Sequence, residues 1–457
     1  MSETSIQAPL TVRDLLDTPR LGRRRVAVIL VGFLCVLLDG IDIGVWGFVY
    51  PHVIADWGVT VQQVTVVATA GYIALALGAL VAGPVADRFG RKPTLLVSVA
   101  LFAVSLLVAG STSSFETIGI CRAIACAGLG AVMPTAITLV SEYLPRKRKA
   151  LLVTVVFCGF PLGQAVVGYM AAFIVPTLGW PSLLIVGGVA GLALLPLVAL
   201  FLPESLTMLL NSSHRLSRAE RIVGRLARSL QEERPIAITA EPQAAGTPPL
   251  EGGIRTVLSR KLVLTSVVVW FAYLVNCTVT YVLIGYLPLI MAQMGTGAEG
   301  SGQVIGMAGW GGLIGSLIIG YTMSRFNQYK VLIIGLALTA ASISIVAFGQ
   351  WPLSALLALG LVWGLLNGGS NGGMNAFASE AFPPHARATG VSWMHSAGKL
   401  GAILSGLFGG LMIAAGWGIG AIFVAFAVPL LIAAGGFGAL ALKQRVDAAS
   451  YNEGLES

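Results

Sequence analysis

Five ionisable side chains lie inside long apolar runs of the sequence, where a charge is unfavourable. Asp39 and Asp42 stand in the first run, Arg122 in the fourth, and His395 and Lys399 in the eleventh. A charge inside a membrane-spanning segment costs roughly 2.5–3.5 kcal/mol on insertion scales, so such a residue is by default a functional candidate. The chemistry open to this set is proton exchange on a carboxylate and binding of a small anion by a cation.

Asp39 and Asp42 are three residues apart and therefore share one face of a helix. Two carboxylates on one face disfavour simultaneous ionisation, so one of them is expected to carry an exchangeable proton. A structural ion pair with Arg122 is the alternative, but one arginine cannot neutralise both aspartates. If only one carries the proton, we predict Asp42, which lies deeper in the run.

The basic side chains inside the runs could bind an anion. Arg122 is predicted to hold a substrate carboxylate, because a planar guanidinium binds carboxylates with two parallel hydrogen bonds. Pairing with one of the aspartates remains the alternative. His395 and Lys399 are four residues apart on one helix face and could bind substrate or move a proton. A purely structural histidine is equally open.

Amide and phenol side chains add neutral binding groups. Asn371 and Asn375 lie one turn apart in the tenth run and are predicted to face a ligand, while Asn367 on the same stripe is undecided between a ligand and a neighbouring helix. Asn276 and Tyr281 in the seventh run could supply an amide, a ring contact and a hydroxyl. All seven candidates from Arg122 to Lys399 are therefore predicted to bind substrate.

Membrane-spanning helices must position these residues. The 457-residue chain is 56% apolar and only 11% charged. A span needs about 20 mostly apolar residues, and lipid offers no partner for an open sheet edge, so each span is expected to be helical. The spans are predicted at 26–50, 62–84, 94–111, 115–141, 150–174, 181–202, 262–291, 300–322, 329–348, 352–379, 387–413 and 418–441. The fold class is an all-α membrane protein.

The basic residues predict the orientation of the chain. Of 28 Lys and Arg residues, all except Arg122 and Lys399 fall in the two tails or in alternate connections. Cytoplasmic loops carry this excess, so both termini are expected in the cytoplasm of a cell (inner) membrane protein. The net charge of +8 then reflects a face that meets anionic lipid, which argues against nucleic acid as a partner.

The sequence contains nothing that indicates an enzyme. The five cysteines all lie inside apolar runs without metal-ligand spacing, so neither a metal nor a cofactor is expected. No nucleophile or nucleotide-binding motif is present either. The expected partners are the lipid bilayer, a small substrate and protons, and the protein is expected to be a monomer.

The second half of the chain repeats the first. Gly83-x-x-x-Asp87-Arg88 recurs 237 residues later as Gly320-x-x-x-Ser324-Arg325, and Ser141-Glu142 recurs 238 residues later as Ser379-Glu380. This predicts two pseudo-symmetric six-helix bundles with a site between them at mid-membrane. The predicted division is an N-terminal tail (1–25), a first bundle (26–203), a linker (204–260), a second bundle (261–442) and a C-terminal tail (443–457).

The linker divides into two parts. From Ser217 to Arg228 the sequence places Ile222, Leu226 and Leu230 on one helical stripe with arginines elsewhere, which predicts a helix lying on the membrane surface. The Pro-, Ala- and Gly-rich stretch from Pro235 to Gly253 is expected to be flexible.

One connection carries a specific motif. Gly83-Pro-Val-Ala-Asp87-Arg88-Phe-Gly90-Arg91-Lys92 fits the pattern G-x-x-x-D-R-x-G-R-K at every fixed position. It resembles the signature of the major facilitator superfamily, which implies a conformational latch made of Gly83, Asp87, Arg88, Gly90, Arg91 and Lys92. Asp87 could accept from the N-terminus of a neighbouring helix, and the basic residues could pair with carboxylates across the seam between the halves. A topology anchor made of positive charge is the alternative.

Three further residues are expected in ion pairs at the cytoplasmic ends of spans. Glu142 and Glu380 both precede basic turns, and Arg387 lies in the second of these turns.

A closer resemblance runs through the first half. Leu38-Asp39-Gly40-Ile41-Asp42 resembles the D-G-x-D signature of the aromatic acid/proton symporter family, and Arg122, Gly128-Leu-Gly130-Ala-Val-Met-Pro134 and Ser141-Glu142-Tyr143-Leu-Pro145 follow in that family's order. The resemblance implies proton-coupled import, by alternating access, of a small aromatic carboxylate such as a benzoate, hydroxybenzoate or phenylpropanoate. Lys399 departs from the arginine expected in relatives, which leaves the substrate open.

Two other transport functions remain as alternatives. One is symport of another small organic acid or a sugar. The other is drug/proton antiport, against which the fifth span speaks, because Gly159-Phe-Pro-Leu-Gly163-Gln164 departs from the G-P-x-x-G-G element of such exporters.

Overall fold

The computed structural model describes residues 10–18, 20–145, 148–210, 216–230, 236–237, 254–293, 297–347, 349, 351–383 and 386–456. Within these residues, twelve helices are long and apolar enough to cross a membrane, as the sequence predicts. They are built from α2 (Arg23–Trp57), α3 (Val61–Phe89), α4 (Arg91–Ser111), α5 (Phe115–Glu142), α6 (Lys149–Phe157), α7 (Gly159–Leu178), α8 (Pro181–Phe201), α12 (Val263–Gln293), α13 (Ala298–Arg325), α14 (Gln328–Val346), α15 (Leu353–Ala381), α16 (Arg387–Ala414) and α17 (Ile419–Glu456).

The fifth predicted span is divided into α6 and α7. The division falls at Cys158. Pro161 lies in the next turn and has no backbone N–H to donate to the carbonyl of Phe157, so the ladder of helix hydrogen bonds is interrupted there.

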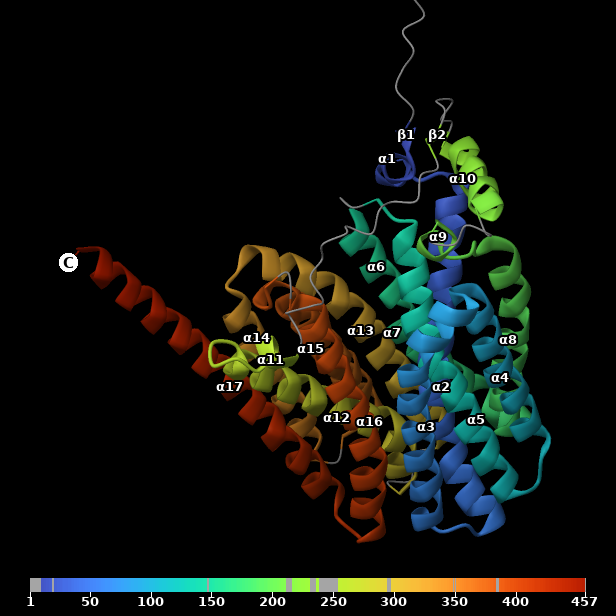
Figure 1. Cartoon of the computed structure of the whole chain (residues 1–457). Helices are drawn as coiled ribbons and strands as arrows, with labels where there is room; N and C mark the ends of the chain where they lie inside the picture. Colours follow the sequence, from blue (N-terminus) through green and yellow to red (C-terminus); the bar gives the residue numbers. More distant parts are fainter. Residues whose placement is uncertain are drawn as a thin grey trace, which may run out of the picture.

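The helices form two bundles that stand side by side (Figure 1). The first half, α2 to α8, and the second half, α12 to α17, each pack around a hydrophobic cluster of their own. This confirms the predicted fold class. Below, the two groups of helices are called the N half and the C half.

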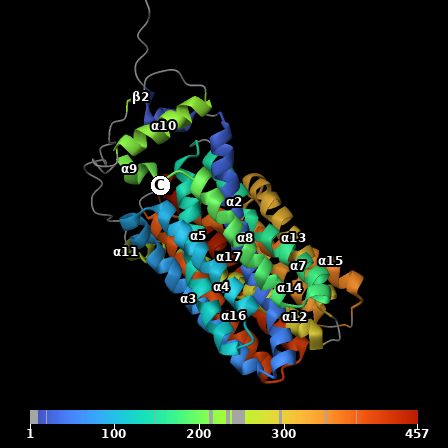
Figure 2. The same ribbon diagram turned by 90° about the vertical axis from the view of Figure 1, so that its right-hand side faces the viewer.

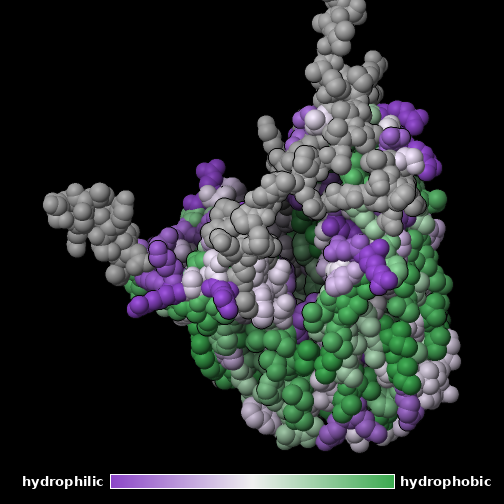
Figure 3. Space-filling model, viewed as in Figure 1, coloured by the Kyte–Doolittle hydropathy of each residue, from purple (hydrophilic) through white to green (hydrophobic). Residues whose placement is uncertain are grey.

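The two halves touch closely through small residues. A Cβ on Gly47 of α2 would collide with the carbonyl of Ile284 in α12, and one on Gly168 of α7 would lie 2.6 Å from the carbonyl oxygen of Gly302 in α13. A Cβ on Gly410 of α16 would collide with the side chain of Thr65 in α3. All three contacts lie toward the end of the bundle away from the tails. At the other end the halves separate, and Figure 3 shows a hollow between them there.

Short elements cover the tail-bearing end of the N half. They are β1 (Leu10–Thr11), α1 (Val12–Asp17), α9 (Leu206–Leu210), α10 (Leu216–Leu230) and β2 (Ile236–Ala237). The short helix α11 (Ile254–Val257) instead packs on the C half, against α16 (Figure 1). β1 pairs in parallel with β2, so the N-terminal segment and the linker meet. The stretch expected to be flexible, 235–253, lies outside the described residues except for 236–237.

The helix predicted on the membrane surface, α10, packs its apolar face against the N half. It lies across the end of the N half, close to α9 and the start of α2 (Figure 2). Its buried face comprises Ala219, Val223, Leu226 and Ala227. The two alanines broaden the apolar stripe and allow close packing, so protein rather than lipid covers this face.

Candidate functional site

A buried ion pair stands at the centre of the N half. Arg122 Nη1 of α5 donates to Asp42 Oδ2 of α2 at 2.6 Å, and both residues are 1% exposed. Trp46 Nε1, one turn along α2, donates to Asp42 Oδ1 at 3.1 Å. The guanidinium of Arg122 also lies over the rings of Trp46 at 4.9 Å and Tyr72 at 5.8 Å. Each oxygen of the Asp42 side chain therefore has one donor.

Two glycines near this ion pair allow close packing around it. A Cβ on Gly71 of α3 would stand 3.1 Å from Arg122 Cγ and Nε, so glycine there leaves space for the guanidinium. Gly40, between the two aspartates, lets α2 press against α7, because a Cβ there would collide with the carbonyl of Phe160. The D-G-x-D spacing thus serves helix packing as well as the carboxylates.

Asp39 has a different environment from Asp42. It is 6% exposed, and it receives no hydrogen bond from the part of the chain that the structure describes. The opposite charge that acts on it most strongly is Lys399 of the C half, ahead of Arg122. Asp39 is thus the aspartate on which a cation of the other half acts most strongly. The expectation that Asp42 carries the exchangeable proton does not fit this geometry, because Asp42 is already bound by Arg122 and Trp46.

Arg122 is likewise placed differently from its predicted role. The bond to Asp42 and the rings of Trp46 and Tyr72 enclose the Arg122 side chain. Its position therefore agrees with the alternative hypothesis, in which Arg122 pairs with an aspartate. Its Nε atom, though buried, has no hydrogen-bond partner among the described residues. Lys399, by contrast, is only partly buried and lies within electrostatic reach of Asp39.

Aromatic rings meet where the halves approach each other. Tyr72 of α3 and Tyr281 of α12 contact edge to face, with ring centroids 5.4 Å apart. Tyr281 also lies within electrostatic reach of Asp39. Tyr72 was not among the sequence candidates, because one tyrosine in an apolar run carries no pattern that separates it from a packing residue.

The C half supplies a polar wall near Lys399. His395 Nδ1 and the hydroxyl of Tyr273 are 3.3 Å apart, and their rings meet edge to face. Asn375 Nδ2 donates to the backbone carbonyl of Asn371 at 2.9 Å. His395, Asn371 and Asn375 are all partly buried. Tyr273, like Trp46 and Tyr72, was not among the residues that the sequence singled out.

The other two asparagines are enclosed. Asn367 Nδ2 donates to Thr280 Oγ1 at 2.8 Å, so this side chain joins α15 to α12. Asn276 is completely buried, and neither of its amide atoms has a partner in the described part of the chain. In this conformation Asn276 is a buried amide with unused hydrogen-bonding capacity.

The latch motif is built around a carboxylate that the sequence did not indicate. Glu204, after α8, accepts at Oε1 from the backbone N–H groups of Arg91 at 3.0 Å and Lys92 at 3.2 Å, and so caps the N-terminus of α4. Asp87, which was expected to do this, is exposed and has no ion pair with any described residue. The capping carboxylate lies 113 positions from Arg91, which local sequence patterns cannot detect.

The basic latch residues contact their own half. Arg91 pairs with Glu142, Lys92 Nζ donates to the carbonyl of Ala199 at 2.5 Å, and Arg88 lies over the ring of Phe89 at 5.3 Å. The predicted pairing across the seam is therefore absent from the described residues in this conformation. The halves are separated at this end, which removes the facing carboxylates from reach.

The ion pair expected in the second half is replaced. Glu380 accepts from Gln328 Nε2, and Arg387 is exposed without an ion pair to any residue the structure describes. Glu142, in contrast, has Arg91 as its partner and also accepts from Ser205 Oγ at 2.9 Å.

Gly90 offers a direct test of the Glu204 cap. Its φ of 111° is unfavourable for other residues, and a Cβ would lie 2.8 Å from Glu204 Oε2. We expect Gly90→Ala to lower the free energy of unfolding by about 1–3 kcal/mol, measured by thermal unfolding in detergent. The matched control is Gly83→Ala, where a Cβ meets nothing within 4 Å and which should leave stability unchanged or slightly raised. Equal melting temperatures for the two variants would contradict this account of the motif.

Known proteins resemble the chain along its whole length. The family model of the Major Facilitator Superfamily matches residues 32–273 and 269–457. The chain is 35% identical to a gallate transporter of Pseudomonas putida, over 95% of this chain and 96% of that protein. It is 33% identical to the 4-hydroxybenzoate transporter PcaK of Acinetobacter baylyi, over 94% of this chain and 93% of that protein. The xylose transporter XylE from E. coli, in an inward-open conformation, shares the fold, with a TM-score of 0.69 at 18% identity over 90% of this chain and 95% of that one.

Proposed function

This chain belongs to the Major Facilitator Superfamily, as a multi-pass membrane protein related to transporters of aromatic acids, and from this premise we propose that it imports a small aromatic carboxylate together with protons. Its relatives are named for gallate and 4-hydroxybenzoate, both hydroxylated benzoates. The single observation that carries the coupling is Asp39, a buried carboxylate whose strongest opposite charge, Lys399, belongs to the other half.

The electrostatic interaction between Asp39 and Lys399 supplies a route for coupling. A substrate carboxylate that binds Lys399 takes over the positive charge that otherwise stabilises ionised Asp39. Asp39 without a compensating cation then favours its protonated form, because a buried unpaired carboxylate is unfavourable. Binding of the acid and uptake of a proton thereby become linked, and the loaded site carries no additional net charge. Asp42 keeps its own cation, Arg122, throughout.

Neutral groups around Lys399 suit an aromatic ring with hydroxyl substituents. Tyr72 and Tyr281 offer ring edges and faces from both halves, where aromatic pairs favour offset or edge-to-face contact. Tyr273, His395, Asn371 and Asn375 offer hydrogen bonds on the C-half side. We assign the ring to the tyrosines and the hydroxyl groups to this polar wall.

The packing of the halves supports alternating access. The close glycine contacts at one end and the hollow at the tail-bearing end describe a transporter open on the side of its tails (Figure 3). With both tails in the cytoplasm, as the distribution of Lys and Arg indicates, this is the inward-facing state. The latch residues belong to the open end and would come together across the seam when the protein faces outward.

Transport by the purified protein tests the proposal. Proteoliposomes with an imposed inward proton gradient should accumulate radiolabelled 4-hydroxybenzoate or gallate, and a protonophore should abolish the accumulation. The uncharged 4-hydroxybenzamide and a sugar should neither accumulate nor compete, since neither presents a carboxylate to Lys399. Equal transport of acid and amide would refute recognition of the carboxylate, and accumulation that survives the protonophore would refute proton coupling.

A further inference from the structure

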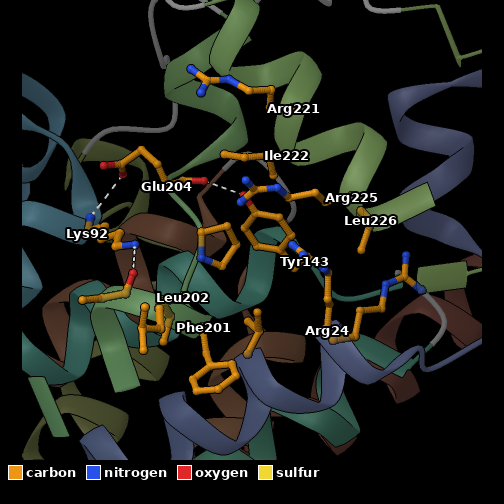
Figure 4. A pocket seen from close by; sticks show the side chains of 15 residues that line it. Arg24, Lys92, Tyr143, Phe201, Leu202, Glu204, Arg221, Ile222, Arg225 and Leu226 are labelled. Atoms are coloured by element: carbon orange, nitrogen blue, oxygen red, sulfur yellow. Dashed lines mark hydrogen bonds between the residues drawn. The ribbon is translucent and has the colours of Figure 1, made fainter. Parts of the chain in front are cut away.

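A polar cavity lies far from the central site, at the tail-bearing end of the N half. It has a volume of about 270 Å³ and is enclosed by the start of α2, the end of α8, the connection after it, and α10 (Figure 4). A volume of this size holds roughly nine water molecules, enough for a hydrated phosphate group. Its cationic lining residues are Arg24, Arg25, Lys92, Arg221 and Arg225.

Glu204, the acidic residue in the lining, already accepts hydrogen bonds from the protein backbone. Glu204 accepts from the backbone N–H groups of Arg91, Lys92 and Ser205, so its charge serves the N-terminus of α4. Its backbone carbonyl accepts from the hydroxyl of Tyr143 at 2.5 Å. The cavity therefore has a large excess of positive charge.

Arg25 forms a rigid part of the wall. It is 1% exposed, and its Nη atoms donate to four backbone carbonyls, those of Leu15, Leu16, Thr18 and Arg20. Its buried Nε has no hydrogen-bond partner among the described residues. Because its Nη atoms are already engaged, Arg25 adds fixed positive charge to the wall rather than a free donor.

The three remaining arginines are exposed. Arg225 and Arg228 act on Arg24 as like charges, and none of Arg24, Arg221 and Arg225 forms an ion pair within the described ranges. An anion bound between Arg24 and Arg225 would relieve their mutual repulsion. Arg24 belongs to α2, while Arg221 and Arg225 belong to α10, and a shared anion would join the two helices.

The apolar side of the cavity faces the membrane. Leu200 is 78% exposed and Phe201 is 50% exposed, at the end of the membrane-spanning helix α8. Basic side chains at the ends of spans meet anionic lipid headgroups. Apolar side chains next to them suit the glycerol and acyl part of the same molecule.

We propose that this cavity binds the phosphate of an anionic phospholipid headgroup, which joins α10 to the membrane-spanning helices of the N half. The shared chemistry is a phosphate ester held by arginine, and arginine binds phosphate oxygens with two parallel hydrogen bonds. The lipid source is favoured over a soluble phosphate because the apolar flank is continuous with the membrane-facing surface of α8. The ligand is a structural partner of the linker and is independent of the transported substrate.

Lipid binding to the full-length protein tests the proposal. Protein purified in a neutral detergent is titrated with phosphatidylglycerol, phosphatidylcholine or glycerol 3-phosphate, and bound ligand is counted by native mass spectrometry. Wild type should retain phosphatidylglycerol in preference to phosphatidylcholine. Arg24→Gln/Arg221→Gln/Arg225→Gln should weaken this binding by roughly ten- to hundredfold, because each basic residue near an anionic headgroup contributes a factor of about five.

A matched variant separates the cavity from general charge. Arg325→Gln/Lys330→Gln/Lys443→Gln removes the same charge from the C half at the same end of the protein and should bind phosphatidylglycerol as wild type does. Arg225→Lys, which keeps a cation, should retain most of the binding. Equal loss in both triple variants, or no loss in the cavity variant, would overturn the proposal. Binding of glycerol 3-phosphate without phosphatidylglycerol, with the same arginine dependence, would overturn the lipid source.

Discussion

Replacing Asp39 by asparagine is expected to abolish accumulation of substrate against its gradient while exchange of labelled for unlabelled substrate continues. The asparagine amide cannot ionise, so the loaded site no longer requires a proton, and exchange needs only the substrate-bound states. The side chain has no hydrogen bond from the described residues to lose, and its size is nearly unchanged, so folding should be preserved. Uptake driven by a proton gradient and counterflow exchange are measured in the same proteoliposomes.

Asp42→Asn is the matched comparison. It removes the carboxylate that Arg122 and Trp46 bind, and leaves a buried guanidinium without a counter-charge. Breaking one partner of a buried ion pair typically costs about 3–5 kcal/mol, so this variant should lose stability and expression before coupling can be assessed. The opposite result would be a stable Asp42→Asn protein without proton-driven accumulation and an Asp39→Asn protein that still accumulates substrate. That result would assign the exchangeable proton to Asp42.

Neutralising Arg122 and neutralising Lys399 should have different consequences. Arg122→Met leaves Asp42 buried and unpaired and is expected to cost about 3–5 kcal/mol of stability, much of which Asp42→Asn/Arg122→Met should recover. Lys399→Met should leave stability nearly unchanged. It should weaken substrate binding by about ten- to hundredfold, because a charge-assisted hydrogen bond to a carboxylate contributes about 1.5–3 kcal/mol.

Unfolding in detergent and equilibrium binding of labelled 4-hydroxybenzoate measure the two effects separately. If Arg122→Met is as stable as wild type and fails to bind the acid, Arg122 would be the residue that reads the carboxylate. If Lys399→Met binds both the acid and its amide like wild type, the assignment of Lys399 fails.

The latch motif shows how far a local pattern reaches. Its spacing predicts a turn between two helices, and the positive φ of Gly90 agrees with that reading. The partners of the motif, Glu142 and Glu204, are distant in sequence, and their choice depends on how α5 and α8 pack against α4. From the sequence alone, any carboxylate at a cytoplasmic end of a span could cap the N-terminus of α4. Asp87 was predicted because it is the carboxylate nearest to that helix in the sequence.

The sequence by itself determined the membrane-spanning helices, their grouping into two repeats and the presence of charges within them. Lipid leaves the backbone no hydrogen-bonding partner outside a helix, so an apolar run of sufficient length indicates a membrane-spanning helix. A charge within such a run is so unfavourable that it indicates a functional residue. Only the tertiary structure decided which aspartate binds Arg122 and which lies within electrostatic reach of Lys399. Asp39 and Asp42 share a residue type and a helix face, and the packing of α2 against α5 distinguishes them. Contacts of that kind depend on packing between helices, which no spacing within one helix encodes.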